Sequence, residues 1–169
     1  MQEQAASGRS QFAGKPAPGF TLPNQDDKLM SLSSLRGQWV VLYFYPRDDT
    51  PGCTCQATEF TTLLGEFRAM NAVVLGVSAD RPWAHRAFIE HYKLGLTLLS
   101  DPDHVAMRQY GAWVDSYLGA EQHSRVVRTT LIIDPRGIIR YHWPEVIPRG
   151  QAERVKQTLD RLQAQSTNS

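Results

Sequence analysis

The run of residues that ends at Cys53 constrains the fold more than any other part of the chain. Residues 39–45 are apolar or aromatic (WVVLYFY) and predict a strand that is buried on both faces. The turn-rich sequence PRDDTPG follows, and we predict a helix from Pro51 or Gly52 to Met70. The sequence therefore places Cys53 at the N-terminus of a helix that leaves a buried strand through a tight turn.

The rest of the chain continues to alternate between strand and helix patterns. The expected strands are 19–23, 28–32, 39–45, 72–78, 96–99, 129–133 and 137–143. The expected helices are one turn at 33–37, then 51–70, 82–93 with Asp80 as its cap, 100–110 and 151–162. A β-α-β half followed by a β-β-α half predicts an α/β, thioredoxin-like fold: a central mixed sheet flanked by helices, with an N-terminal β-hairpin.

Length and composition favour a single globular domain. The chain has 169 residues, and we expect a domain at 14–162 between disordered ends at 1–13 and 163–169. A net charge of +1 gives no electrostatic basis for binding nucleic acid or an anionic membrane. The sequence shows neither the apolar stretch of a secretory signal nor a run approaching the ~20 apolar residues of a membrane span. The two cysteines offer no disulfide framework, which favours a reducing compartment and hence the cytoplasm.

The predicted position of Cys53 favours reactivity. Free N–H groups and the positive end of the dipole at a helix N-terminus both favour the thiolate form of a cysteine over the thiol. The thiolate is the form that acts as a nucleophile. Most lone cysteines are small buried residues with no chemical role, but the turn chemistry around Cys53 argues against that interpretation.

Three separated segments resemble one family. The sequence 45–54 (YPRDDTPGCT) resembles the peroxiredoxin active-site motif, in which proline, threonine and cysteine keep this spacing. Residues 98–102 (LLSDP) and 110–113 (YGAW) resemble the bacterioferritin-comigratory, or PrxQ-like, branch of that family. Residues 128–137 (RTTLIIDPRG) resemble the strand that carries the family's active-site arginine. The resemblance covers residues 14–162.

The resemblance implies a thiol-dependent peroxidase that reduces hydrogen peroxide and organic hydroperoxides through a sulfenic acid at Cys53. Cys53 would be the nucleophile, and Thr50 would hold the peroxide near the sulfur. Arg128 would stabilise the thiolate and polarise the peroxide. Pro46 would shield the sulfur from water, and Gly52 would leave backbone N–H groups facing the substrate.

The chain departs from this branch at the step that follows oxidation. The two usual positions of a resolving cysteine hold Thr58 and Trp83, so Cys55 is the only other thiol. At about 100° per residue, Cys55 points roughly 200° away from Cys53, on the polar helix face that it shares with Glu59. We therefore expect a one-cysteine enzyme that thioredoxin, glutaredoxin or a small thiol recycles. The alternative is a strained Cys53–Cys55 disulfide that forms after the first helical turn unwinds.

Two other functions fit a Cys-x-Cys pair on this fold: a thiol–disulfide oxidoreductase, and a non-catalytic peroxide sensor that passes oxidation on through Cys55. The oxidoreductase has no need of the proline, threonine and arginine of the motif. A zinc site would need four ligands, whereas the five histidines are scattered along the chain, so we expect neither a metal nor a cofactor. The PrxQ-like branch is often monomeric, and we expect a monomer.

Overall fold

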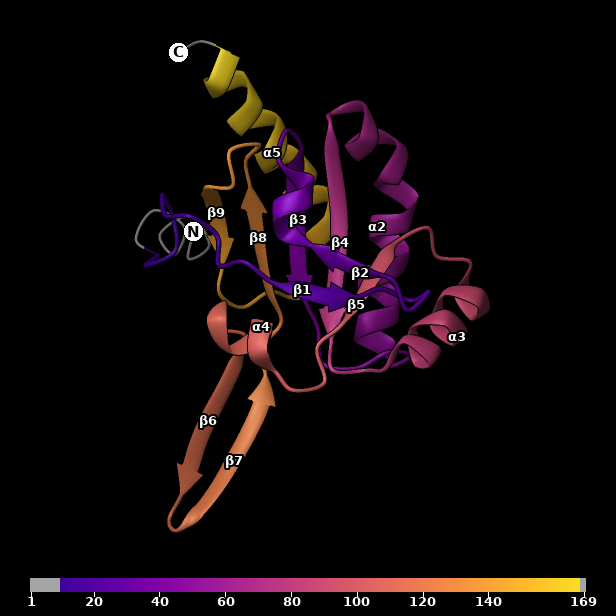
Figure 1. Ribbon diagram of the computed structural model, residues 1–169, viewed down its shortest axis with the longest axis vertical. Coiled ribbons are helices and arrows are strands. Elements are labelled where there is room, and N and C mark those ends of the chain that lie inside the picture. Colours follow the sequence, from indigo (N-terminus) through magenta and orange to yellow (C-terminus); the bar gives the residue numbers. More distant parts are fainter. Residues whose placement is uncertain (1–9, 168–169) are drawn as a thin grey trace.

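The computed structural model describes residues 10–167, which fold around a five-stranded sheet (Figure 1). Its strands are β1 (Thr21–Pro23), β2 (Leu29–Ser31), β3 (Trp39–Phe44), β4 (Ala72–Ser78), β5 (Thr97–Ser100), β6 (Trp113–Leu118), β7 (Glu121–Val126), β8 (Thr129–Ile133) and β9 (Ile139–Trp143). Its helices are the 3-10 turn η1 (Leu32–Leu35), α2 (Pro51–Ala69), α3 (Pro82–Tyr92), α4 (Val105–Gln109) and α5 (Gln151–Thr167).

The central sheet has the strand order β5-β4-β3-β8-β9. Strand β3 lies at its centre, parallel to β4 and antiparallel to β8, so the sheet is mixed. Strands β1 and β2 form a separate antiparallel hairpin near the N-terminus. The predicted thioredoxin-like architecture, including the N-terminal hairpin, is confirmed.

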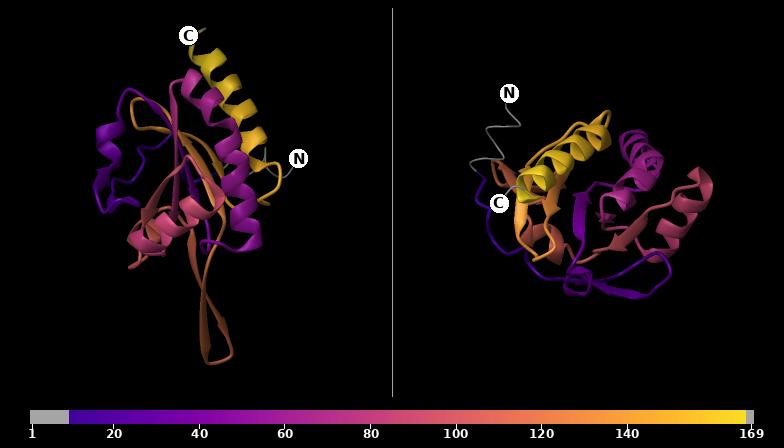
Figure 2. Two further views of the ribbon diagram at one scale, coloured as in Figure 1. Left: turned by 90° about the vertical axis from the view of Figure 1, so that its right-hand side faces the viewer. Right: turned by 90° about the horizontal axis from the view of Figure 1, so that it is seen from above.

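The apolar run of β3 is buried throughout because helices or loops cover both faces of the sheet. Successive side chains of a strand point to opposite faces, and β3 divides its residues between two core clusters in this way. Trp39, Val41 and Tyr43 enter the core beneath α2, α3 and α5, whereas Val40, Leu42 and Phe44 enter the core beneath η1 and α4. Figure 2 shows these two layers on either side of the sheet.

Helix α2 packs beside α5 on one face of the sheet (Figure 2). Cys53, Phe60, Leu64 and Phe67 recur at helical spacing and are all buried in the same core cluster. Burying a phenylalanine side chain is worth roughly 1.5–3 kcal/mol, so this stripe fixes the rotation of α2 about its own axis. The helical-wheel prediction for the face that carries Cys53 is confirmed.

The two ends of the chain differ from the expectation. We predicted disorder at 1–13; residues 1–9 lie outside the described part, but Ser10 and Phe12 pack against His142. We predicted that the last helix would end at Leu162, whereas α5 continues to Thr167. Gln163 donates a hydrogen bond to the carbonyl of Met70 at 2.6 Å, which ties this extension to the end of α2.

The N-terminal ends of two helices also differ from the prediction, in the cap residue of α3 and in the first residue of α4. Asp80 does not cap α3, because Arg81 occupies the cap position and the carboxylate of Asp80 accepts hydrogen bonds from elsewhere. Helix α4 begins at Val105, and Asp101 accepts from the backbone N–H groups in its first turn. No helix among the described residues is both long and apolar enough to cross a bilayer.

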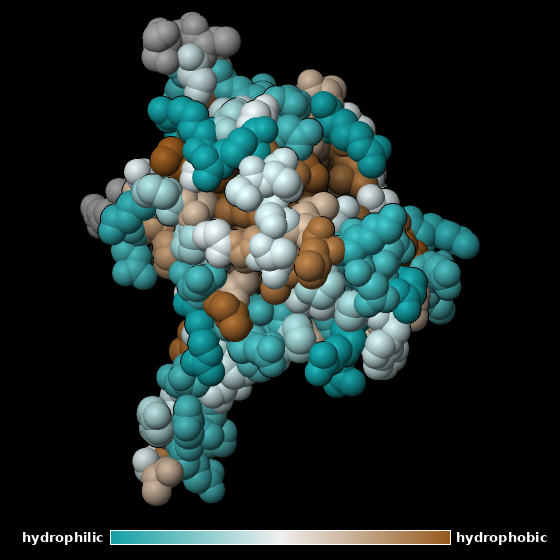
Figure 3. All heavy atoms as spheres, in the orientation of Figure 1, coloured by the Kyte–Doolittle hydropathy of each residue, from teal (hydrophilic) through white to brown (hydrophobic). Residues whose placement is uncertain are grey.

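A hairpin formed by β6 and β7 was not predicted. It projects from the body as a two-stranded ribbon (Figure 1), and its surface is mostly hydrophilic (Figure 3). Only Trp113 and Val126, at its base, are half-buried, and the other strand residues are exposed. Because neither face is buried, the ribbon lacks the alternation of apolar and polar residues by which a strand is recognised in a sequence.

Candidate active site

Cys53 lies in the first turn of α2, as predicted. Thr50 has an extended backbone at the cap position, and Pro51 occupies the first helical position, where its missing N–H costs nothing. Asp49 has a positive φ of 61°, which turns the chain from the end of β3 into the helix. The side chain of Cys53 points into the core, and the residue is only 2% exposed.

Arg128 reaches the sulfur from a segment 75 residues away in the sequence. Its Nη2 donates to Cys53 Sγ at 3.5 Å, and its Nη1 donates to Gln56 Oε1 at 2.8 Å. Gln56 is fully buried one turn after Cys53 and orients the guanidinium. The carbonyl of Arg128 accepts from the backbone N–H of Val146, which anchors the arginine just before β8. The structure thus brings the predicted cation and the predicted nucleophile together.

Gly52 leaves room for this close approach. A Cβ added there would lie 3.2 Å from Arg128 Nη2 and 3.2 Å from Pro148 Cγ, closer than side chains ordinarily pack. A larger residue at position 52 would therefore require Arg128 or Pro148 to shift by a few tenths of an ångström. Gly52 has no positive φ, so the lack of a side chain is what matters here.

Thr50 and Pro46 lie on the loop between β3 and α2. The hydroxyl of Thr50, which is half-buried, donates to the carbonyl of Arg47 at 2.9 Å, and this bond fixes its rotamer. A hydroxyl that donates one hydrogen bond still has lone pairs with which to accept another. Pro46 is exposed at the start of the loop.

Cys55 points to the other side of the helix. Its thiol is half-buried and donates to Glu59 Oε2 at 3.6 Å. The other carboxylate oxygen of Glu59 accepts from the backbone N–H of Gly150 at 2.8 Å, so Glu59 is held in place. Burial and the nearby Glu59 carboxylate raise the pKa of Cys55. Its environment therefore disfavours the thiolate, whereas Cys53 faces a guanidinium.

The floor of the site is aromatic. The rings of Tyr43 and Phe60 stack with centroids 4.8 Å apart, in the same core cluster as Cys53. Burial, together with the charges of Cys53 and Asp48, raises the pKa of Tyr43 well above its ordinary value. Burial likewise raises the pKa of Tyr45. Both tyrosines are therefore neutral at physiological pH.

A buried polar cluster beneath the loop was missed by the sequence reasoning. Asp48 accepts from Tyr45 and is bound to His85, a fully buried residue that we had counted among scattered histidines. Asp48, Asp80 and His85 place their ligand-type atoms within 4.8 Å of one another, but hydrogen bonds already engage all three side chains. The position of His85 on the face of α3 that carries Phe88 was the one signal that could have revealed it.

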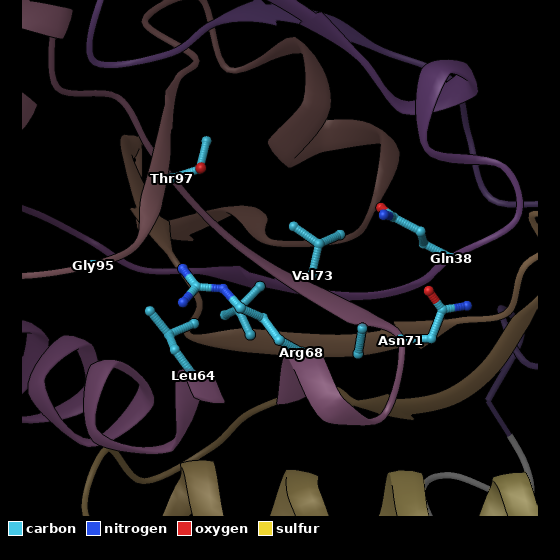
Figure 4. Close-up of a pocket in the computed structure, with 9 residues that line it drawn as sticks. Gln38, Leu64, Arg68, Asn71, Val73, Gly95 and Thr97 are labelled. Carbon is cyan, nitrogen blue, oxygen red and sulfur yellow. The ribbon is translucent and has the colours of Figure 1, made fainter. Parts of the chain in front are cut away.

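The pocket in Figure 4 is separate from this site. It measures about 360 Å³ and lies where α2 ends and β4 begins, lined by Leu64, Arg68, Asn71 and Thr97 among others. Arg68 follows Cys53 by 15 residues of the same helix, a rise of roughly 22 Å. The pocket therefore has no part in the chemistry of Cys53.

A buried cysteine at a helix N-terminus, in contact with an arginine on a thioredoxin-like fold, defines a cysteine-based redox enzyme. The family model described as "AhpC/TSA family" matches residues 13–142. The chain therefore belongs to the AhpC/TSA family, and it is a peroxiredoxin, a thiol-dependent peroxidase.

Individual relatives agree with this assignment. A protein of Coxiella burnetii assigned as the peroxiredoxin bcp is 42% identical over 142 residues, which cover 84% of this chain and 94% of that protein. The bacterioferritin comigratory protein of Xanthomonas campestris superposes with a TM-score of 0.81 at 30% identity, covering 84% of this chain and 90% of its own. The peroxidoxin BcpB of Mycobacterium tuberculosis superposes with a TM-score of 0.77 at 32% identity, covering 88% and 96%. The predicted resemblance to the bacterioferritin-comigratory branch is confirmed.

Proposed function

We propose that Cys53 is the peroxidatic nucleophile and that Arg128 is its cationic partner. The observation that carries the proposal is the 3.5 Å contact between Arg128 Nη2 and Cys53 Sγ at the N-terminus of α2. The thiolate attacks one oxygen of the peroxide, the S–O bond forms as the O–O bond breaks, and the leaving oxygen takes up a proton. The products are a sulfenic acid at Cys53 and either water or an alcohol.

The surrounding residues would assist this step in different ways. Arg128 stabilises the thiolate and the negative charge that develops on the leaving oxygen. Thr50 aligns the peroxide through its hydroxyl, and the N–H groups of Gly52 and Cys53 add donors at the helix N-terminus. Pro46, at the start of the loop, limits the access of water to the sulfur.

The substrates would be hydrogen peroxide and small organic hydroperoxides. The Xanthomonas campestris relative has alkyl peroxide reduction activity, which supports the second class. The sulfur of Cys53 is nearly buried, so a small peroxide fits the site better than a bulky one. We place the enzyme in the cytoplasm and expect it to act as a monomer.

We propose a one-cysteine cycle. Cys55 is engaged by Glu59 on the outer face of α2, so it does not face the sulfenic acid. An external thiol attacks the sulfenic acid and releases water, and a second thiol then displaces Cys53 from the mixed disulfide. Thioredoxin, glutaredoxin or a small thiol could serve as this reductant.

Substitution of each cysteine tests the cycle. Cys53→Ser should abolish peroxide consumption, and substantial turnover in that variant would refute the assignment. Cys55→Ser should keep most turnover with a small thiol as reductant. In both wild type and Cys55→Ser, one equivalent of peroxide should give a dimedone adduct at Cys53 by mass spectrometry. A loss of two hydrogens without an adduct in the wild type would instead establish a Cys53–Cys55 disulfide.

The role of Arg128 has its own test. Arg128→Met keeps most of the bulk of the side chain and removes its charge, so the rate of peroxide attack should fall by about 10²-fold or more. An unchanged rate would remove Arg128 from the mechanism.

A further inference from the structure

The loop that carries Thr50 (residues 46–50), which we call the active-site loop, is fixed by hydrogen bonds to polar side chains that lie outside it. The backbone N–H of Asp48 donates to Asp80 Oδ2 at 2.8 Å, and the hydroxyl of Tyr45 donates to Asp48 Oδ1 at 2.6 Å. The hydroxyl of Tyr92, on α3, donates to Asp49 Oδ1 at 2.6 Å. The conformation of the loop therefore depends on neighbouring elements as well as on its own sequence.

His85 is the most deeply buried of these neighbours. It lies on α3 with no exposed surface, and both of its ring nitrogens are engaged. Nδ1 lies 2.7 Å from Asp48 Oδ2, and Nε2 lies 3.0 Å from the carbonyl oxygen of Leu99. A carbonyl can only accept, so Nε2 carries a proton, and a further proton lies between Nδ1 and the carboxylate. The imidazole thus bridges β5 and the active-site loop.

The two bonds of His85 have different consequences. The bond to Leu99 fixes the imidazole ring against the sheet. Because the ring is fixed, its bond to Asp48 also fixes the position of the active-site loop. Asp48 is itself only 9% exposed, so its carboxylate cannot exchange a lost partner for water without moving outward. Thr50 lies two residues after Asp48, and Cys53 lies five residues after Asp48. A movement of Asp48 would therefore reach both residues.

We propose that His85 is a positioning residue of the peroxidase site. Acting through Asp48, it holds the active-site loop in the conformation that presents the Thr50 hydroxyl to a peroxide at Cys53. The inference rests on the proposed roles of Thr50 and Cys53. Figure 1 shows the arrangement on which it depends, with α3 beside the N-terminal end of α2.

Two substitutions separate the two bonds of the ring. In His85→Gln the amide nitrogen can occupy the place of Nε2, which keeps the bond to Leu99 and loses the bond to Asp48. In His85→Asn it can occupy the place of Nδ1, which keeps the bond to Asp48. We expect His85→Gln to lower the second-order rate constant for hydrogen peroxide by about tenfold or more, with the rate of Cys53 alkylation by iodoacetamide near that of the wild type.

His85→Asn should keep most of the peroxide rate. An unchanged peroxide rate in His85→Gln, equal losses in the two variants, or equal slowing of peroxide attack and alkylation would each overturn the inference. The comparison of the two reactions matters because alkylation needs the thiolate but does not need an aligned peroxide.

Asp48→Ser removes the same bond from the side of the loop and serves where His85→Gln does not fold. We expect a similar loss of the peroxide rate in Asp48→Ser, and an unchanged rate there would overturn the inference. If both single variants fold, the double variant should be no slower than the slower of them, because both substitutions break one link. Additive losses would show that the residues act separately and would overturn it too.

Ile89→Ala is the matched control, because Ile89 packs against the core from the same helix. It should lower the melting temperature and leave the peroxide rate unchanged; a loss as large as that of His85→Gln would overturn the inference. Cys53→Ser is measured in parallel. Turnover retained in Cys53→Ser would refute the proposed function, whereas an inactive Cys53→Ser beside a fully active His85→Gln would refute only the role of His85.

Discussion

Replacement of Gly52 by alanine should slow catalysis without weakening the fold. The new Cβ would lie 3.2 Å from Arg128 Nη2 and from Pro148 Cγ, so one of these neighbours must give way by a few tenths of an ångström. Alanine is a better helix former than glycine by roughly 1 kcal/mol in a helix interior, and this preference applies in part at position 52, the second residue of α2. The contact therefore disfavours the guanidinium position, while the helix itself gains.

The size of the effect follows from the distance between the charges. Arg128 Nη2 and Cys53 Sγ are 3.5 Å apart. At an effective dielectric constant of about 20, a retreat of about 0.5 Å removes about 0.6 kcal/mol of attraction. This loss corresponds to about a threefold slower attack on peroxide, if the transition state feels the same field as the thiolate.

The assay is the rate of Cys53 oxidation under single-turnover conditions, together with the free energy of unfolding in urea. Gly65→Ala is the matched control, since Gly65 lies in the same helix and its Cβ would meet open space. Gly65→Ala should raise stability by about 0.5–1 kcal/mol and leave the rate unchanged. A Gly52→Ala enzyme as fast as Gly65→Ala would refute the idea that the missing side chain at position 52 positions Arg128.

Thr50→Val should slow peroxide attack by about tenfold or more and leave alkylation of Cys53 nearly unchanged, because only the peroxide needs the hydroxyl; equal slowing of both reactions would point to a disturbed loop. Glu59→Gln should lower the pKa of Cys55, which burial and Glu59 now raise, so that in a Cys53→Ser background iodoacetamide modifies Cys55 faster at pH 8; an unchanged rate would contradict this. Burial lowers the pKa of His142 to about 4 from its ordinary 6.5, so the unfolded chain takes up this proton first. The free energy of unfolding is therefore unaffected by His142 above pH 6.5 and falls by up to about 3 kcal/mol as the pH drops to 4. Urea titrations should show a flatter pH dependence of this free energy for His142→Gln than for the wild type.

The elements around Cys53 could be predicted because their signals are local. Strand β3 is a continuous apolar run, and the first turn of α2 is marked by Pro51 and Gly52. The helical period was enough to place Cys53 and Cys55 on different faces. The pairing of Arg128 with Cys53 spans 75 residues, and only the family resemblance indicated it.

The polar cluster beneath the loop could not be predicted from local patterns. His85 and Asp48 lie 37 residues apart. The sequence pattern of a histidine on the buried face of a helix is the same whether or not the histidine has a hydrogen-bond partner. Ser10 and Phe12 were misjudged for a related reason. A polar segment of this composition predicts disorder, yet its few anchoring contacts are with His142 and Tyr110, far along the chain.

We expect the β6–β7 ribbon to be removable, because it forms a sheet of its own. Its two ends meet at its base, where the backbone N–H of Val127 donates to the carbonyl of Ala112 at 2.7 Å. The ribbon contributes no strand to the central sheet, and a short turn could join Ala112 to Val127 in its place. Exposed hairpin tips are also the places where chains best accept inserted domains. Because each strand of the ribbon has six residues, its tip lies about 20 Å from its base, so a domain grafted onto the tip would stay clear of Arg128 while every strand of the central sheet kept its sequence.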